Sequence, residues 1–185
     1  RPHAWRSVVV AATALLFFYS LAVLPLAVAL ALSFTSPIFI ALFAAAILGE
    51  RPGRSILVAL VLGFAGVLVV LWSELTPAAG EEANALGLAA AIGAAITYAL
   101  SMVVLKSRAA RDPLPTIVLL QNSFAGLLLA PLGIWQWTAP AGGEILVFLG
   151  IGMLGTAGHL CMAWAYGRAD ASRLGVFEYT AFVWA

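Results

Sequence analysis

The sequence predicts an all-α protein whose helices cross a lipid bilayer several times. About 64% of its 185 residues are hydrophobic and only 9% are charged, against roughly 25% charged residues in an ordinary soluble domain. The net charge is +1, so the chain has no basic surface for nucleic acid. Its uncharged stretches are long enough for helices of about 20 residues, the length that crosses the hydrocarbon core. These observations exclude a soluble enzyme, a disordered segment and a nucleic-acid-binding protein.

The uncharged stretches divide the chain into seven helical segments. The first stretch, residues 7–49, is about twice as long as one span requires, so we expect a hairpin that turns at Pro25. The last segment starts near Leu174 and is too short to cross the bilayer before the sequence ends, so we expect a fragment of a longer chain. The expected spans are residues 7–24, 27–48, 56–72, 86–105, 116–135 and 145–166, followed by the truncated seventh.

The basic residues predict the orientation of these spans. Every Lys and Arg falls beside alternate connections, namely Arg1, Arg6, Arg51, Arg54, Lys106, Arg108, Arg111, Arg168 and Arg173. The other three connections hold none of them, and one carries Glu74, Glu81 and Glu82. Because positive residues stay on the cytoplasmic side, we expect a multi-pass inner-membrane protein with the Arg1 end in the cytoplasm. Trp5, Trp72, Trp135 and Trp137 lie at span ends, where they would anchor the helices at the interface.

A family resemblance covers nearly the whole chain. Residues 16–54 read LFFYSLAVLPLAVALALSFTSPIFIALFAAAILGERPGR, with a proline in mid-helix and Leu-Gly-Glu at the helix end. GFAGV follows at residues 63–67, and residues 163–185 read AWAYGRADASRLGVFEYTAFVWA. In order and length these segments resemble the EamA-domain transporters of the drug/metabolite transporter (DMT) superfamily.

The resemblance implies ten membrane helices arranged as two inverted five-helix repeats, of which this chain would hold the third to the ninth. Residues 1–73 would be the C-terminal part of the first repeat, with three spans. Residues 86–185 would be the N-terminal part of the second repeat, with four spans, the last one truncated. The implied function is the transport of a small metabolite or drug-like molecule by alternating access, without a cofactor or a metal. The implied partners are the lipid bilayer, a small-molecule substrate and a second copy of the chain in a homodimer.

Two other functions stay open, an intramembrane enzyme and a helical assembly protein that transports nothing. The sequence has only two histidines, His3 and His159, and no G-x-S-x-G or H-E-x-x-H motif. Cys161 is two residues from His159, so on a helix the two side chains point apart. The residues therefore favour a protein that is not an enzyme.

His159 and Glu178 are the most informative candidates for a binding site. Ionisable residues inside membrane spans are costly and usually functional. His159 lies seven residues before the end of its span at Tyr166, and Glu178 lies five residues past Arg173 in the next span. Because these spans are antiparallel, we expect the two side chains at similar depth, paired with each other, and acting on a substrate or a proton.

Further polar or amphipathic residues inside the spans could line a cavity or hold helices together. Pro37 should kink the second span, and the neighbouring hydroxyl of Ser36 could satisfy a freed backbone group. Glu50 lies at a helix C-terminus, where a carboxylate is unfavourable, so we expect a structural ion pair with Arg51 or Arg54, of which we take Arg54. The remaining cavity candidates are Tyr19, Tyr98, Ser101, Gln121, Asn122, Trp164 and Tyr179.

Overall fold

The computed structural model describes residues 2–74, 84–109, 112–135, 137–140 and 142–183. Its elements are α1 (Pro2–Val23), α2 (Leu26–Ser33), α3 (Ser36–Phe43), the π-helical η1 (Ala44–Leu48), α4 (Arg54–Glu74), α5 (Ala85–Ala109), α6 (Leu114–Trp135), α7 (Gly142–Tyr166), α8 (Ala171–Phe177) and the 3-10 helix η2 (Glu178–Val183). Arg1, Arg111, Glu81 and Glu82, which enter the orientation argument, lie outside the described residues.

These elements confirm the all-α class and the order of seven helical segments. Five segments are long and apolar enough to cross a membrane, namely Trp5–Val23, Leu26–Leu48, Ala85–Ala109, Leu114–Trp135 and Gly142–Tyr166. Helix α4 carries a shorter apolar run, Arg54–Val69. The hairpin at Pro25 is also confirmed, because α1 ends at Val23 and Pro25 takes an extended conformation before α2 begins.

The second segment differs from the single kinked helix that Pro37 predicts, because it is interrupted. Helix α2 ends at Ser33 and α3 begins at Ser36, so the break precedes the proline. Pro37 occupies the first turn of α3, where its missing N–H costs nothing and its fixed φ suits a helix start. The segment closes with η1, and Gly49 then takes a positive φ of 70° to end it.

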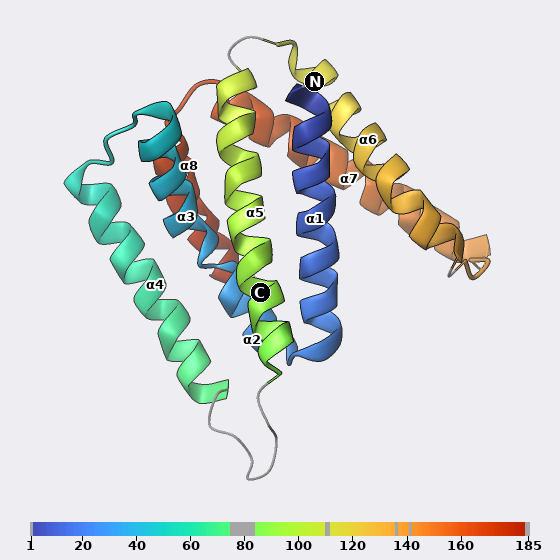
Figure 1. Ribbon diagram of the computed structural model, residues 1–185, viewed down its shortest axis with the longest axis horizontal. Helices are drawn as coiled ribbons and strands as arrows, with labels where there is room; N and C mark the ends of the chain where they lie inside the picture. Colours follow the sequence, from blue (N-terminus) through green and yellow to red (C-terminus); the bar gives the residue numbers. More distant parts are fainter. Residues whose placement is uncertain (1, 75–83, 110–111, 136, 141, 184–185) are drawn as a thin grey trace.

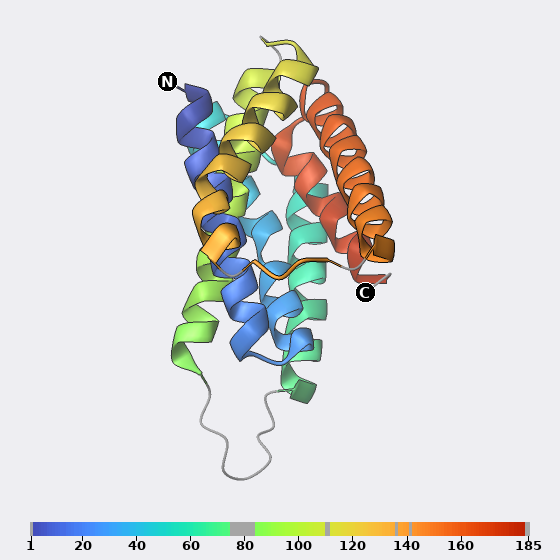
Figure 2. The same cartoon turned by 90° about the vertical axis from the view of Figure 1, so that its right-hand side faces the viewer.

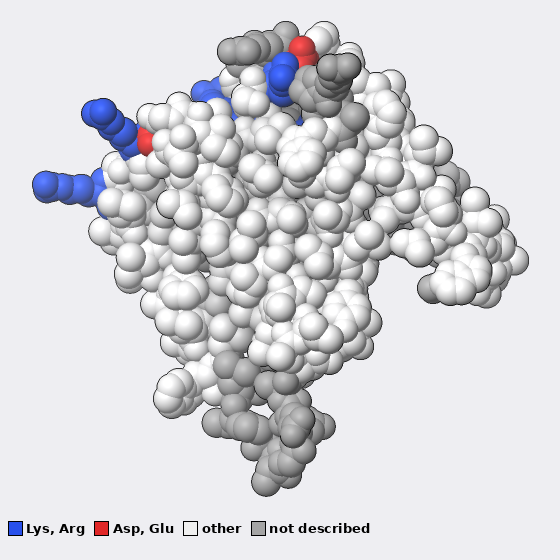
Figure 3. Space-filling model, in the orientation of Figure 1, with Lys and Arg blue, Asp and Glu red and all other residues white. Residues whose placement is uncertain are grey.

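Helices α1 and α5 lie side by side and antiparallel at the centre of the bundle (Figure 1). Helix α6 crosses α1, and on the other side α7 runs upward beside α8, which returns downward (Figure 2). The described basic residues lie at the end where α1 begins, where α5 and α7 end, and where the chain passes from α3 to α4 and from α7 to α8; we call this the basic end. In Figure 3 the coloured charged side chains gather toward this end, and the described residues on the rest of the visible face are uncharged.

The larger buried cluster also lies at the basic end. It joins the ends of α3, α5 and α7 to the starts of α6 and α8, and contains Ile40, Ala44, Ala99, Met102, Val103, Leu105, Ile117, Val118, Ala163, Tyr166 and Ala171. A smaller cluster of Val28, Ala31, Val67 and Leu71 joins α2 to α4 toward the opposite end. We refer to these as the basic-end cluster and the opposite-end cluster. The polar residues between the two clusters define the candidate site.

Candidate functional site

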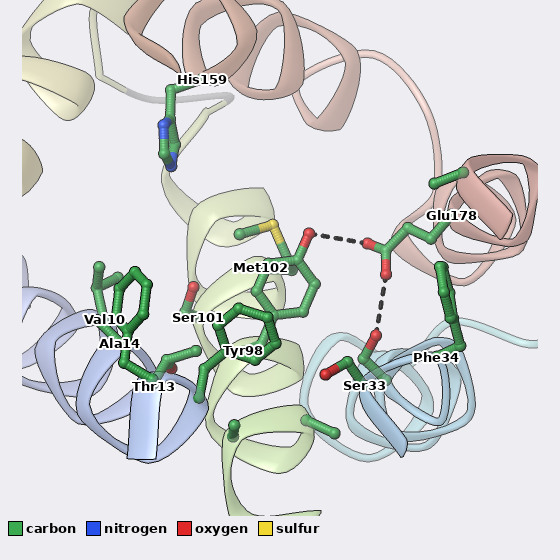
Figure 4. Close-up of a pocket in the computed structure, with 16 residues that line it drawn as sticks. Val10, Thr13, Ala14, Ser33, Phe34, Tyr98, Ser101, Met102, His159 and Glu178 are labelled. Carbon is green, nitrogen blue, oxygen red and sulfur yellow. Dashed lines mark hydrogen bonds between the residues drawn. The ribbon is translucent and has the colours of Figure 1, made fainter. Parts of the chain in front are cut away.

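A cavity of about 530 Å³ opens between α1, the α2–α3 break, α5, α7 and η2. Its volume falls within the range of small-molecule sites, about 300–1,000 Å³. Figure 4 shows α1, α5 and the α2–α3 break below it and His159 and Glu178 on separate sides. The lining residues are Val10, Thr13, Ala14, Phe17, Phe18, Ser33, Phe34, Ser36, Ala94, Ala95, Tyr98, Ser101, Met102, His159, Glu178 and Ala181.

The lining is mostly apolar with a small number of polar groups, the composition typical of a pocket for an organic ligand. Alanine, valine, methionine and aromatic side chains supply most of the wall. Hydroxyl groups come from Thr13, Ser33, Ser36, Tyr98 and Ser101. Glu178 is the acidic residue among the lining residues, and neither Lys nor Arg lies among them.

Glu178 ties three elements together at the cavity wall. It is the first residue of η2, where α8 tightens into a 3-10 helix. The Tyr98 hydroxyl of α5 donates to its Oε1 at 3.1 Å, and the Ser36 hydroxyl at the start of α3 donates to its Oε2 at 3.1 Å. The carboxylate therefore meets both interrupted helical segments, α2–α3 and α8–η2, at the point where each is interrupted.

His159 lines the same cavity but is not paired with Glu178, so the predicted direct pair is wrong. The Nε2 atom of His159 lies 3.4 Å from the Nε2 atom of Gln121, and its Nδ1 atom lies 3.2 Å from the Gly155 carbonyl oxygen. The imidazole and the carboxylate face different parts of the cavity (Figure 4). The positions of the two residues in the sequence predicted a similar depth in the membrane. They did not predict how α7 is rotated about its own axis, which decides the direction of the His159 side chain.

The hydroxyl groups at the α2–α3 break have different partners, and Ser36 does not bond a freed backbone group as predicted. Ser33 donates to the Ala29 carbonyl at 2.9 Å, and Thr35 donates to the Leu32 carbonyl at 2.7 Å. The Thr35 N–H also donates to the Leu32 carbonyl, at 3.1 Å, so the Thr35 hydroxyl supplements a backbone hydrogen bond at the break. Ser36 instead turns to Glu178, and Pro37 is buried beside it without lining the cavity.

The remaining candidates separate into two groups. Tyr98 and Ser101 line the cavity, and Gln121 is buried on α6 next to His159. Asn122, one position further on α6, is exposed. Tyr19 is exposed as well and does not line the cavity.

Two aromatic candidates also lie outside the cavity. Trp164 is exposed on α7, where the Arg168 guanidinium lies 4.2 Å from its ring centroid. Tyr179 packs against the opposite-end cluster, and its ring lies so close to Gly63 of α4 that a side chain there would collide with it. Helix rotation separates both residues from the cavity, although Tyr179 follows Glu178 directly.

Glu50 does not form the predicted ion pair with Arg54. Its Oε1 accepts a hydrogen bond from the Ala171 N–H at 2.9 Å, and its Oε2 accepts from the N–H and the hydroxyl of Ser172 at 3.0 Å and 2.8 Å. The carboxylate thus caps the first turn of α8, where N–H groups without a partner in the helix and the helix dipole favour a negative charge. The prediction took a cation close in sequence and missed a helix start that only the folded chain brings to Glu50.

Several lining residues carried no signal of their own in the sequence. Phe17, Phe34 and Met102 are ordinary apolar residues of membrane helices, so nothing distinguished them from residues that face lipid. Thr13 was detectable as a polar residue inside a span. Its hydroxyl oxygen lies 2.9 Å from the Val9 carbonyl oxygen and 2.9 Å from the Thr97 hydroxyl oxygen of α5, within hydrogen-bond distance of both. Thr13 therefore both lines the cavity and joins α1 to α5.

Comparison with known proteins places this arrangement in a family. The model of the EamA-like transporter family matches residues 6–72 and 85–185. The chain belongs to the EamA-like transporter family. It is 31% identical over 185 residues to a protein named "Riboflavin transporter" from Rhizobium johnstonii, a match that covers 95% of this chain and 57% of that protein. It is 28% identical over 163 residues to the "Uncharacterized transporter YvbV" of Bacillus subtilis, covering 84% of this chain and 52% of the relative.

A solved crystal structure shares the fold with a TM-score of 0.74 at 28% sequence identity, and the match covers 97% of this chain and 63% of the other. The chain spans about half the length of the curated relatives it matches. It is therefore a multi-pass membrane protein of a transporter family, whose matched part includes every residue of the cavity.

Proposed function

We propose that this chain forms the substrate path of a secondary transporter that carries a small organic molecule by alternating access. The observation that supports the proposal is the cavity of about 530 Å³, with a mostly apolar wall and a few polar groups at the α2–α3 break. Interrupted helices at a midplane site are a recurrent feature of secondary transporters. The two segments matched by the family model agree with a division into two inverted repeats, which we propose as the basis of the movement.

We propose a substrate with a flat, ring-containing body, because Phe17, Phe34 and Tyr98 line the cavity. Riboflavin is a suitable first compound, since one relative bears that name. The full-length protein would be reconstituted in vesicles, and flux of riboflavin and of other small aromatic metabolites measured. Saturable flux of at least one compound is expected.

A pair of adjacent variants tests whether the cavity is the path. Ala14 lines the cavity, whereas Leu15, the next residue of α1, is 47% exposed on the outer face. Ala14→Phe would fill the cavity and should abolish flux, while Leu15→Phe should leave it unchanged. Equal flux in both variants would show that the substrate passes elsewhere, and turnover of a compound without flux would favour an intramembrane enzyme.

We propose that the basic end faces the cytoplasm, with the protein in the inner membrane, because positive residues are retained on that side. Single cysteines would be placed in a Cys161→Ser background and labelled from outside intact cells with a reagent that does not cross the membrane. Gly53 and Asp170 are exposed at the basic end, and Ala139 is exposed between α6 and α7. The Ala139 cysteine should react and the other two should not, and the reverse pattern would invert the topology.

The homodimer allowed by the family resemblance is a separate proposal. Helix α4 exposes Val58, Val61, Leu62 and Val69 along one side, a surface that either lipid or a second copy could cover. The mass of the protein in lipid nanodiscs decides between the two. A single copy per disc at all protein concentrations would remove the dimer without affecting the transport proposal.

A further inference from the structure

Among the described residues, the cavity wall holds one carboxylate, that of Glu178, and neither Lys nor Arg. Ser36 and Tyr98 donate hydrogen bonds to Glu178, but both donors are neutral hydroxyls. None of the described Lys and Arg side chains contributes to the cavity wall. His159, the lining residue that can carry a positive charge, contacts Gln121 and the Gly155 carbonyl instead.

The carboxylate of Glu178 also retains acceptor capacity. An ionised carboxylate offers about four lone-pair positions. Two hydroxyl groups occupy one position on each oxygen, which leaves each oxygen able to accept a further hydrogen bond. Because Glu178 lines the cavity, a ligand inside the cavity can approach this carboxylate.

A charge inside a membrane protein is costly when no opposite charge lies near it. A ligand that brings the opposite charge removes this cost, and the free energy recovered adds to its binding. Phe34 lies beside Glu178 in the cavity wall, and Tyr98 brings a second ring to the same carboxylate (Figure 4). Aromatic faces attract cations as well, so the rings and the carboxylate favour the same kind of ligand group.

We propose that Glu178 selects for ligands with a cationic amine, held between its carboxylate and the rings of Phe34 and Tyr98, and against ligands with a carboxylate at that position. This inference rests on the proposed function only in using the same cavity. The Ser36 and Tyr98 hydroxyls are positioning groups, because they fix the carboxylate at the junction of α3, α5 and η2.

The test compares three probes of similar shape and different charge: 2-phenylethylamine, 2-phenylethanol and 3-phenylpropionate. Binding to the purified full-length protein in nanodiscs would be measured by calorimetry, without any flux. The amine should bind about tenfold more tightly than the alcohol, the difference expected between a charged and a neutral hydrogen-bond donor on a carboxylate. The anion should bind more weakly than both.

Glu178→Gln should remove this order, so that the amine and the alcohol bind within about twofold of each other. Asp170→Asn is the matched control, because Asp170 is an exposed carboxylate outside the cavity, and it should keep the wild-type order. If Glu178→Gln does not fold, the order of the three probes in the wild-type protein still decides. Equal affinities for amine and alcohol in the wild-type protein, or an unchanged preference in a folded Glu178→Gln protein, would overturn the proposal.

The outcomes for charge selection and for transport are distinguishable. Flux of aromatic compounds without any amine preference would overturn the role of Glu178 and leave the transport proposal standing. An amine preference that depends on Glu178, in a protein that transports nothing, would support the binding site and overturn the transport proposal.

Discussion

At the basic end, α3, α5, α6, α7 and α8 share a cluster of eleven buried residues, whereas toward the opposite end α2 and α4 share a cluster of four. Two polar ties between elements reinforce the basic end, from Glu50 to the start of α8 and from Lys106 to the Ala169 carbonyl. At the opposite end, the side-chain bond from the Gly87 N–H to Asn84 Oδ1 lies within the first turn of α5 itself.

This difference shows how the chain divides its stability around the cavity. The basic end combines close packing with charge-assisted hydrogen bonds, which are stronger than neutral ones. The opposite end depends on close contacts of small residues, such as Gly63 against Tyr179 and Gly87 against Val23 and Leu24. We expect the helices to separate less readily at the basic end than at the opposite end. If the protein works by alternating access, the basic end would then be the closed side in this conformation.

The largest expected effect comes from removing the Glu50 cap. Glu50→Ala leaves the Ala171 and Ser172 N–H groups of α8 without their acceptor, and both residues are buried. A hydrogen bond to a charged group contributes about 1.5–3 kcal/mol, so the loss of several should lower stability by about 3 kcal/mol. Thermal unfolding of the full-length protein in detergent measures this change.

The matched control for this cap is Arg54, the ion-pair partner that the sequence suggested. Arg54 is exposed, so Arg54→Ala should change stability by less than about 0.5 kcal/mol. Comparable destabilisation by both substitutions would mean that Glu50 acts through Arg54 after all. It would also remove the cap as the cause of the rigid basic end.

A smaller effect is expected from filling the closest contact toward the opposite end. A Cβ atom on Gly63 would collide with the Tyr179 ring, so Gly63→Ala forces the ring or η2 to move. Overpacking of this kind costs about 1–3 kcal/mol. Gly66, one turn further along α4, has open space, so Gly66→Ala should be neutral or slightly stabilising. If the two variants unfold at the same temperature, the close contact between Gly63 and Tyr179 does not stabilise the opposite end.

The sequence predicted the helices and their order because hydropathy and proline positions act locally. The hairpin at Pro25 follows from the length of one uncharged stretch, whereas Pro37 predicted a kink within one helix and the chain is instead interrupted before the proline. It also singled out Glu178, Tyr98, Ser36 and His159, which line the cavity, because polar groups are rare inside spans.

Pairings between elements could not be predicted in the same way. Glu178 meets Ser36 and Tyr98, which are far from it in the chain, and Glu50 meets the start of α8. Helix rotation decides which of two neighbours faces inward, as Gln121 and Asn122 or Glu178 and Tyr179 illustrate. Rotation depends on packing between helices, and a uniformly apolar membrane helix gives little periodic signal for it.

The smallest expected effect concerns Lys106, the second polar tie of the basic end. Its Nζ atom donates to the Ala169 carbonyl oxygen at 2.6 Å, and so joins the last turn of α5 to the connection between α7 and α8. Lys106→Met keeps most of the apolar stem and removes the donor, which should lower stability by about 1 kcal/mol. Arg173→Met is the control, because Arg173 is an exposed basic residue of the same end and its loss should leave the unfolding temperature unchanged.

Amide exchange in α8 gives a second measurement of the Lys106→Met variant, since loosening the connection before α8 should speed exchange there and leave α4 unaffected. Faster exchange in α4 than in α8 would mean that the weakening spreads through the whole bundle, and the two ends would then not be independently stabilised.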